Sequence, residues 1–315
     1  MSTTAVRNAG ILQTGAAVSR ATGQTSAERR LEVDEECFKQ NFDRVPFLLR
    51  HNLAGHPLFE LPRLVELSRK LRPGTVEYSS GSVPIGLKPE LTPRTGLSIQ
   101  ETIERIQESG SWMVLKYVEQ DPDYRELLNR CLDEIVPLTR ERAPGMCRRE
   151  GFIFISSPGS ITPYHLDPEY NFLLQVRGQK AISIFDPADR RVISEEELEN
   201  YYYGSHRNLE YLEALQGTAS VFDLTPGIGL FFPVTAPHWV KNGEQVSISF
   251  SVTFRSRASE KRSVVYTVNR HLRRLGLKPT PAGESAWLDF IKYNGVRVMR
   301  RSRRIVRSLR PGVTA

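Results

Sequence analysis

Short stretches in the central part of the chain alternate apolar and polar residues, a pattern that predicts β-strands. Residues 112–118 and 246–254 alternate in this way over the length of a strand. Residues 171–187 contain two apolar stretches joined by an Arg-Gly pair, which predicts two strands connected by a tight turn. A Pro-Gly turn within residues 223–233 introduces a further short apolar strand. The chain is therefore expected to be mainly β.

Helical patterns precede and follow these strands. A Ser-x-x-Glu capping box predicts a helix over residues 98–108, and an Asp-Pro pair predicts another over residues 121–140. Nearer the N-terminus we expect a strand at residues 47–50 and a Leu-rich helix at residues 57–71. The strand pattern is thus expected to have helices on its N-terminal side.

The composition sets the scale of the fold. With 315 residues, 39% of them hydrophobic, the chain can bury a sizeable core, and we expect one main domain with helical additions. No apolar run approaches the roughly 20 residues needed to span a bilayer. Residues 1–30 lack the apolar segment of a signal peptide and are expected to be a disordered lead-in. Three dispersed cysteines indicate no disulfide framework, which favours a cytoplasmic protein.

The net charge of +7 is concentrated near the C-terminus. After Asp289 the chain has eight basic residues and no acidic one, so the rest of it has 35 basic against 36 acidic residues. Apolar residues recur at helical spacing in this segment: Ile291, Val298, Ile305 and Leu309. The spacing predicts a basic amphipathic helix, and residues 290–310 are expected to contact an anionic membrane, at the inner membrane surface, or nucleic acid. The alternative is a helix packed on its own domain with its arginines in solvent.

The candidate chemistry lies in a His-x-Asp motif, His165 and Asp167, and in His238 about seventy residues later. On an extended strand, residues separated by one position point to the same side, so both side chains of the motif can face one ion. His238 precedes the alternating stretch 246–254 and is placed to supply a third ligand from another strand. Two imidazoles and one carboxylate on one face of a metal leave the opposite positions open, as in non-haem Fe(II) oxygenases. The four other histidines have no partner at ligand spacing and are expected to be structural or exposed.

Together with its surroundings, this motif resembles the cupin-like, Jumonji-C-related 2-oxoglutarate oxygenases, over about residues 110–255. The branch it resembles most contains the asparaginyl hydroxylase that acts on a hypoxia-inducible factor. The resemblance implies a double-stranded β-helix, a jelly-roll barrel of antiparallel strands, that uses Fe(II), 2-oxoglutarate and O2. It assigns the iron ligands to His165, Asp167 and His238.

The same resemblance implies residues that bind 2-oxoglutarate. Lys180 matches the lysine that pairs with the distal carboxylate, and Thr162 matches a hydroxyl that binds the same carboxylate. Asn171 matches an asparagine near the cosubstrate. At Ser251 the branch has an asparagine, so we expect the near side of the cosubstrate site to be held differently. A further contact from Lys116 or Tyr117 is left open.

The implied activity is hydroxylation of a C–H bond, with release of succinate and CO2, in a small metabolite or a protein side chain. Two alternatives stay open: a non-catalytic cupin-like regulatory protein that contacts nucleic acid, and a cupin isomerase or hydrolase with another divalent metal. The sequence indicates no oligomeric state.

Within the chain, residues 31–257 are expected to form the catalytic domain, with the barrel core at about 110–257, and residues 258–315 a basic helical extension. An insertion at residues 193–216 lies between the strands that carry the expected metal ligands. It contains three consecutive tyrosines and is expected to form either part of a lid or a surface helix with aromatic packing.

Overall fold

The computed structural model describes the backbone of residues 29–308 and the side chains up to residue 299. Most of the expected N-terminal lead-in therefore lies outside the described residues, as do Leu309 and Arg310 and the side chain of Ile305. No helix in the described part of the chain is both long and apolar enough to cross a membrane.

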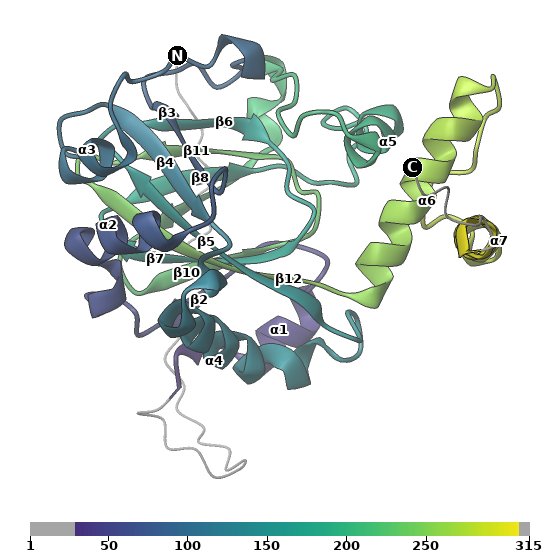
Figure 1. Ribbon diagram of the computed structural model, residues 1–315, viewed down its shortest axis with the longest axis horizontal. Helices are drawn as coiled ribbons and strands as arrows, with labels where there is room; N and C mark the ends of the chain where they lie inside the picture. Colours follow the sequence, from purple (N-terminus) through teal and green to yellow (C-terminus); the bar gives the residue numbers. More distant parts are fainter. Residues whose placement is uncertain (1–28, 309–315) are drawn as a thin grey trace, which may run out of the picture.

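Two antiparallel sheets face each other and form the barrel (Figure 1). The larger sheet has the strand order β1-β2-β10-β7-β12-β5-β4-β3 and the smaller one the order β6-β11-β8-β9. The larger sheet consists of β1 (Leu31–Glu32), β2 (Phe47–His51), β3 (Val76–Ser80), β4 (Ser111–Lys116), β5 (Cys147–Ser156), β7 (Tyr170–Arg177), β10 (Ile228–Phe232) and β12 (Ser247–Arg255). The smaller sheet consists of β6 (Ile161–His165), β8 (Lys180–Ile184), β9 (Ser220–Leu224) and β11 (His238–Asn242). This is the predicted jelly-roll architecture.

Helices cover the outer face of the larger sheet and extend from one side of the barrel. They are α1 (Glu35–Asn41), α2 (Leu61–Lys70), α3 (Ile99–Glu104), α4 (Pro122–Thr139), α5 (Glu195–Tyr203), α6 (Arg257–Arg274) and α7 (Ala286–Ser308). Short 3-10 helices lie at Pro57–Phe59, Pro89–Leu91, Val118–Gln120 and Glu213–Thr218. The capping box at Ser98 is present, but α3 ends at Glu104, and turns replace the last residues of the predicted helix.

The alternation in β12 separates two buried faces. Phe250 and Phe254 belong to the large hydrophobic core shared with α1, α2 and α4. Ser249, Ser251 and Thr253 alternate with them and point away from that core, yet each of these three side chains is also buried. The polar positions of this strand therefore line the barrel interior and do not face solvent.

The turn within residues 171–187 connects the two sheets. The two predicted strands are present, but β7 pairs in the larger sheet and β8 in the smaller one, so they do not form a hairpin. Gly178 in the turn has a φ of +68°, and a Cβ atom there would lie 2.3 Å from the carbonyl oxygen of Val246. A residue without a side chain is thus required where the chain changes sheet.

Beyond the barrel, the insertion and the C-terminal helices pack on one another. The rings of Tyr202 in α5 and Tyr266 in α6 stack with centroids 5.1 Å apart and an interplanar angle of 4°. Arg273 donates two hydrogen bonds, of 2.8 and 2.9 Å, to the carboxylate of Glu199. Figure 1 shows α5, α6 and α7 on the same side of the molecule. The aromatic packing expected for the insertion is present, and its partner is α6.

Candidate metal centre

Three side chains converge at one end of the smaller sheet. His165 is the last residue of β6 and His238 the first of β11, and the two lie directly opposite each other in the antiparallel ladder. The Oδ2 atom of Asp167 lies 3.7 Å from Nε2 of His165 and 3.8 Å from Nε2 of His238. Donor atoms that bind one ion at ~2.1 Å are themselves about 3–4 Å apart, so these three atoms fit a common metal.

A backbone carbonyl orients each imidazole. Nδ1 of His165 lies 2.7 Å from the carbonyl oxygen of Pro163, and Nδ1 of His238 lies 2.9 Å from that of Ala236. Because a carbonyl only accepts hydrogen bonds, both Nδ1 atoms carry the proton and both Nε2 atoms present a lone pair. Partners of this kind fix the tautomer that binds metal.

The charge states of the three groups also suit a metal. Burial lowers the pKa of His165 well below its ordinary value and also lowers the pKa of His238, which keeps both rings neutral. Burial alone would raise the pKa of Asp167, but the positive charge of Arg207 holds it below its ordinary value. Neutral imidazole and ionised carboxylate are the forms that coordinate metal ions.

The local backbone differs from the expectation of one extended strand. β6 ends at His165, and Asp167 reaches the same point from the segment that follows. Leu166 lies between them and is buried in a small apolar cluster with Ile193 and Leu198. The packing of Leu166 therefore fixes the direction in which the chain presents Asp167.

Arg207, from the insertion, contacts the other oxygen of the carboxylate. Its Nη1 lies 3.4 Å from Oδ1 of Asp167, on the side away from the two imidazoles. Backbone hydrogen bonds from Leu166 N to Arg207 O (3.2 Å) and from Leu209 N to Tyr164 O (3.1 Å) hold this segment along β6. Sequence reasoning missed Arg207, since forty residues separate it from Asp167 and no motif contains both.

Thr162 and Lys180 lie on the face of the smaller sheet that carries the two histidines. Thr162 pairs with Val240 and Lys180 with Asn242, both on β11 at two-residue steps from His238. Lys180 is buried, and burial lowers its pKa to about 7. Among the described residues, no carboxylate forms an ion pair with it.

Asn171 and Ser251 lie on the opposite wall of the barrel, in neighbouring strands of the larger sheet. Ser251 donates a hydrogen bond of 2.8 Å from its hydroxyl to Oδ1 of Asn171. Both residues line a cavity of about 230 Å³ that reaches Asp167. Lys116 and Tyr117 line the same cavity, and the ammonium of Lys116 forms an ion pair with Glu77.

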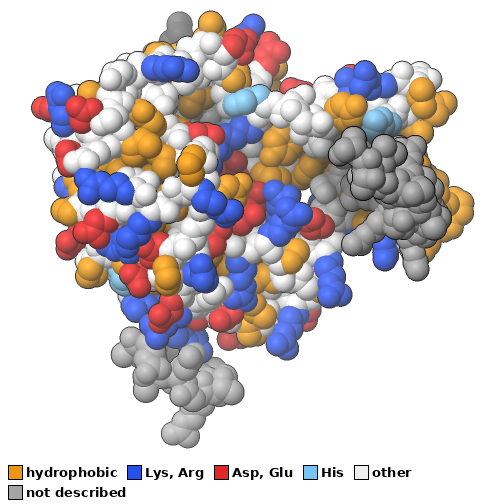
Figure 2. All heavy atoms as spheres, in the orientation of Figure 1, with side chains coloured by type: hydrophobic (Ala, Val, Ile, Leu, Met, Phe, Trp, Pro, Cys, Tyr) orange, Lys and Arg blue, Asp and Glu red, His pale blue; other side chains and the backbone are white. Residues whose placement is uncertain are grey.

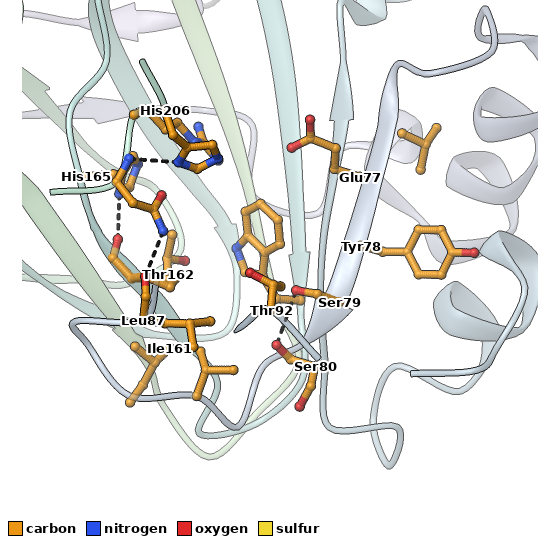
Figure 3. A pocket seen from close by; sticks show the side chains of 16 residues that line it. Glu77, Tyr78, Ser79, Ser80, Leu87, Thr92, Ile161, Thr162, His165 and His206 are labelled. Atoms are coloured by element: carbon orange, nitrogen blue, oxygen red, sulfur yellow. Dashed lines mark hydrogen bonds between the residues drawn. The ribbon is translucent and has the colours of Figure 1, made fainter. Parts of the chain in front are cut away.

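A larger cavity, of about 390 Å³, opens on the other side of His165. Figure 3 shows His165, Thr162 and His206 on one wall, and Glu77 and Ser79 of β3 on the other. The indole Nε1 of Trp112, which also lines this cavity, is buried with no hydrogen-bond partner among the described residues. Arg207 lines both cavities, so its guanidinium lies where they adjoin the candidate metal centre.

The fold and the His-Asp-His group together define a jelly-roll protein with a candidate centre for a divalent metal in the described part of the chain. No protein-family profile matches the chain. Lysine-specific demethylase 8 of Danio rerio is 32% identical over 102 residues, which are 30% of this chain and 24% of that protein. JmjC domain-containing protein D of Dictyostelium discoideum is 27% identical over 114 residues, 31% of this chain and 23% of that protein. The chain thus spans about a quarter of the length of these relatives, and they support the resemblance to JmjC-related oxygenases.

Solved structures of Escherichia coli YcfD align with most of this chain. One aligns with a TM-score of 0.49 and 16% identity, covering 86% of this chain and 68% of YcfD. A second, described as a ribosomal oxygenase in complex with cobalt and 2-oxoglutarate, aligns with a TM-score of 0.48 and 15% identity, covering 87% of this chain and 68% of that one. Because both TM-scores are below 0.5, the fold is assigned from the strand order of the two sheets and not from these alignments.

Proposed function

We propose that this protein is an Fe(II)- and 2-oxoglutarate-dependent dioxygenase that hydroxylates a C–H bond and releases succinate and CO2. The observation that carries the proposal is the convergence of two Nε2 lone pairs and one carboxylate oxygen at a buried point between two cavities. Such a centre leaves coordination positions open to a cosubstrate and to oxygen. The relatives that contain a JmjC domain support this reading.

Each residue around the centre has a distinct task. His165, Asp167 and His238 would hold the iron, and Arg207 holds Asp167 in its orientation through the oxygen that does not face the imidazoles. When bound, the iron and 2-oxoglutarate supply the oxygen chemistry, in which one atom of O2 enters succinate and the other enters the product. The ring of Phe232, with its centroid 4.7 Å from that of His238, helps exclude water from the centre.

The buried Lys180 supports the binding of a dianionic cosubstrate, and this observation does not depend on the His-Asp-His group. A buried ammonium without a carboxylate partner is costly, and an incoming carboxylate compensates that cost. The hydroxyl of Thr162 would bind the same carboxylate, and Asn171 with Ser251 would border the cosubstrate from the larger sheet. A non-catalytic cupin has no use for such a cation, so this feature favours the oxygenase over the regulatory alternative.

We infer that the substrate is a protein side chain in preference to a small metabolite. The support is the relative named as a lysine-specific demethylase. Cavities on both sides of the centre leave room for a substrate beside the cosubstrate.

The experiment that tests the activity is succinate formation by protein purified without oxygen, loaded with Fe(II), 2-oxoglutarate and ascorbate, and then exposed to O2. We expect slow turnover even without the true substrate, and its loss in Lys180→Ala. Lys241→Ala is the matched control, because Lys241 is exposed on the neighbouring strand. Binding of a divalent metal without any 2-oxoglutarate binding or succinate would instead favour the isomerase or hydrolase.

A further inference from the structure

The last helix of the described chain lies against α6. α7 packs against α6, and the ammonium of Lys261 in α6 lies 5.9 Å from the ring centroid of Phe290. Lys292 donates a hydrogen bond of 2.8 Å from Nζ to the carbonyl oxygen of Thr280, in the connection between the two helices. Leu288 and Val296, which precede and follow Lys292 in α7, are partly buried. α7 is therefore held in place by α6.

Large apolar side chains of α7 are nevertheless exposed. Trp287 is 69% exposed, Phe290 58% and Ile291 46%. With 3.6 residues per turn these three positions share one side of the helix. Single exposed apolar residues are ordinary, but a tryptophan, a phenylalanine and an isoleucine grouped on one helix indicate a binding surface. Figure 2 shows hydrophobic side chains exposed on the projection formed by α6 and α7.

The sequence of the same helix carries strong positive charge. No acidic residue follows Asp289, and the carboxylate of Asp289 already accepts a hydrogen bond of 2.9 Å from Gly283 N. Lys292, Arg297 and five further arginines lie within α7, and Arg310 follows it in the sequence. An exposed aromatic and aliphatic side combined with many arginines and lysines is typical of helices that lie in a membrane interface.

We propose that α7 binds the surface of an anionic membrane, with its axis in the plane of the interface. Trp287, Phe290 and Ile291 enter the boundary between headgroups and acyl chains, and the positive charge of the segment attracts it to anionic headgroups. The residues that would bind the membrane are separate from those of the candidate metal centre.

Charge and exposed apolar surface together favour an anionic membrane over a second copy of this chain or a nucleic acid. A twofold contact between copies of this chain would place the same surface on both sides, and so would bring two strongly basic helices together with one acidic residue each. A nucleic acid would satisfy the charges but would leave the apolar side of α7 in water. An anionic bilayer satisfies both features.

The test is sedimentation of the full chain with vesicles of phosphatidylcholine alone or with 30% phosphatidylglycerol. We expect binding to the anionic vesicles, weakened by 0.5 M salt, and at least tenfold weaker binding for the Trp287→Ser, Phe290→Ser double variant. Leu91→Ser is the matched control, because Leu91 is a 64% exposed leucine on the barrel domain. Ile291→Ser is the second variant, and thermal melting checks that each variant is folded.

Spectroscopy and light scattering complete the test. On binding, Trp287 should leave water, so the fluorescence of the wild type shifts to the blue and that of Trp287→Phe does not. The proposal is wrong if the chain does not bind anionic vesicles and instead forms a dimer that the double variant abolishes. It is equally wrong if RNA binds the chain and the vesicles do not.

Discussion

Arg207 contacts one candidate metal ligand, Asp167, through the oxygen that does not face the imidazoles. Its guanidinium lies 3.4 Å from Oδ1 of Asp167, whereas Oδ2 faces the two imidazoles. Removing such a partner usually costs a carboxylate ligand its orientation, and metal affinity with it.

We therefore expect Arg207→Gln to weaken Co(II) binding about tenfold or more, measured by competition with a chelator, while the fold is kept. Arg207→Lys should recover part of the affinity, because it restores a positive charge without the planar fork. Arg190→Gln, a variant of an exposed arginine just before the insertion, is the control. Equal Co(II) affinities for wild type and Arg207→Gln would show that Asp167 is oriented by other contacts.

Lys180 makes the stability of the folded protein depend on pH. Burial lowers its pKa to about 7, far below that of an unfolded lysine. Between pH 7 and about 10.4 the unfolded chain holds a proton that the folded chain has released, so stability increases with pH across this window. Below pH 7 the folded protein bears the full cost of a buried ammonium.

In the absence of 2-oxoglutarate, we expect Lys180→Met to stabilise the protein at pH 7 or below by about 2 to 4 kcal/mol in urea unfolding. The same variant should lose the pH-dependent increase in stability between pH 7 and 10. For the wild type, calorimetric titration should show 2-oxoglutarate binding weaken above pH 7, as the cation disappears. A pH-independent affinity would mean that Lys180 does not bind the cosubstrate.

The sequence predicted residues of the centre that share a motif or a resemblance, and it missed those that depend on tertiary contacts. His165, Asp167 and His238 meet in the structure because two of them pair across neighbouring strands. The contact of Arg207 with Asp167 follows from the path of an insertion, and short-range patterns contain no information on that path.

At the level of elements, strand alternation predicted the positions of strands better than their partners. The alternating residues of β12 were recognised, but the polar face of this strand lines the barrel and is buried. The two strands within residues 171–187 were also expected, although they belong to different sheets. Which sheet a strand joins depends on long-range pairing, which a local turn signal does not specify.

Gly178 tests this change of sheet. Its positive φ and the 2.3 Å approach of an added Cβ to Val246 O predict that Gly178→Ala destabilises the fold by about 3 kcal/mol. Gly159→Ala is the matched control, because Gly159 has a φ of +69° and open space around its Cα, so about 1 kcal/mol is expected. Urea unfolding measures both. Similar losses for the two variants would show that the turn relaxes around the new methyl group.

For the whole molecule, we expect metal binding to raise the free energy of unfolding and the Tm. A ligand present at a hundredfold excess over its Kd adds about 2.7 kcal/mol to the folded state, which corresponds to roughly 5 °C or more in Tm for a domain of this size. We expect Co(II) to raise the Tm of the wild type by this amount in a thermal melt and to have no such effect on Asp167→Ala. Asp223→Ala, a variant of an exposed aspartate on β9, should respond like the wild type. A Tm shift that survives in Asp167→Ala would place the metal elsewhere.

The packing of α5 on α6 connects the candidate metal centre with the helix proposed to bind a membrane. Tyr202 stacks on Tyr266, so α6 contacts both α7 and α5, and Arg207 follows α5 by only a few residues. Such a path makes lipid and metal candidates for energetic coupling, and coupling of this kind is reciprocal. Any factor by which vesicles change metal affinity must equal the factor by which metal changes vesicle affinity.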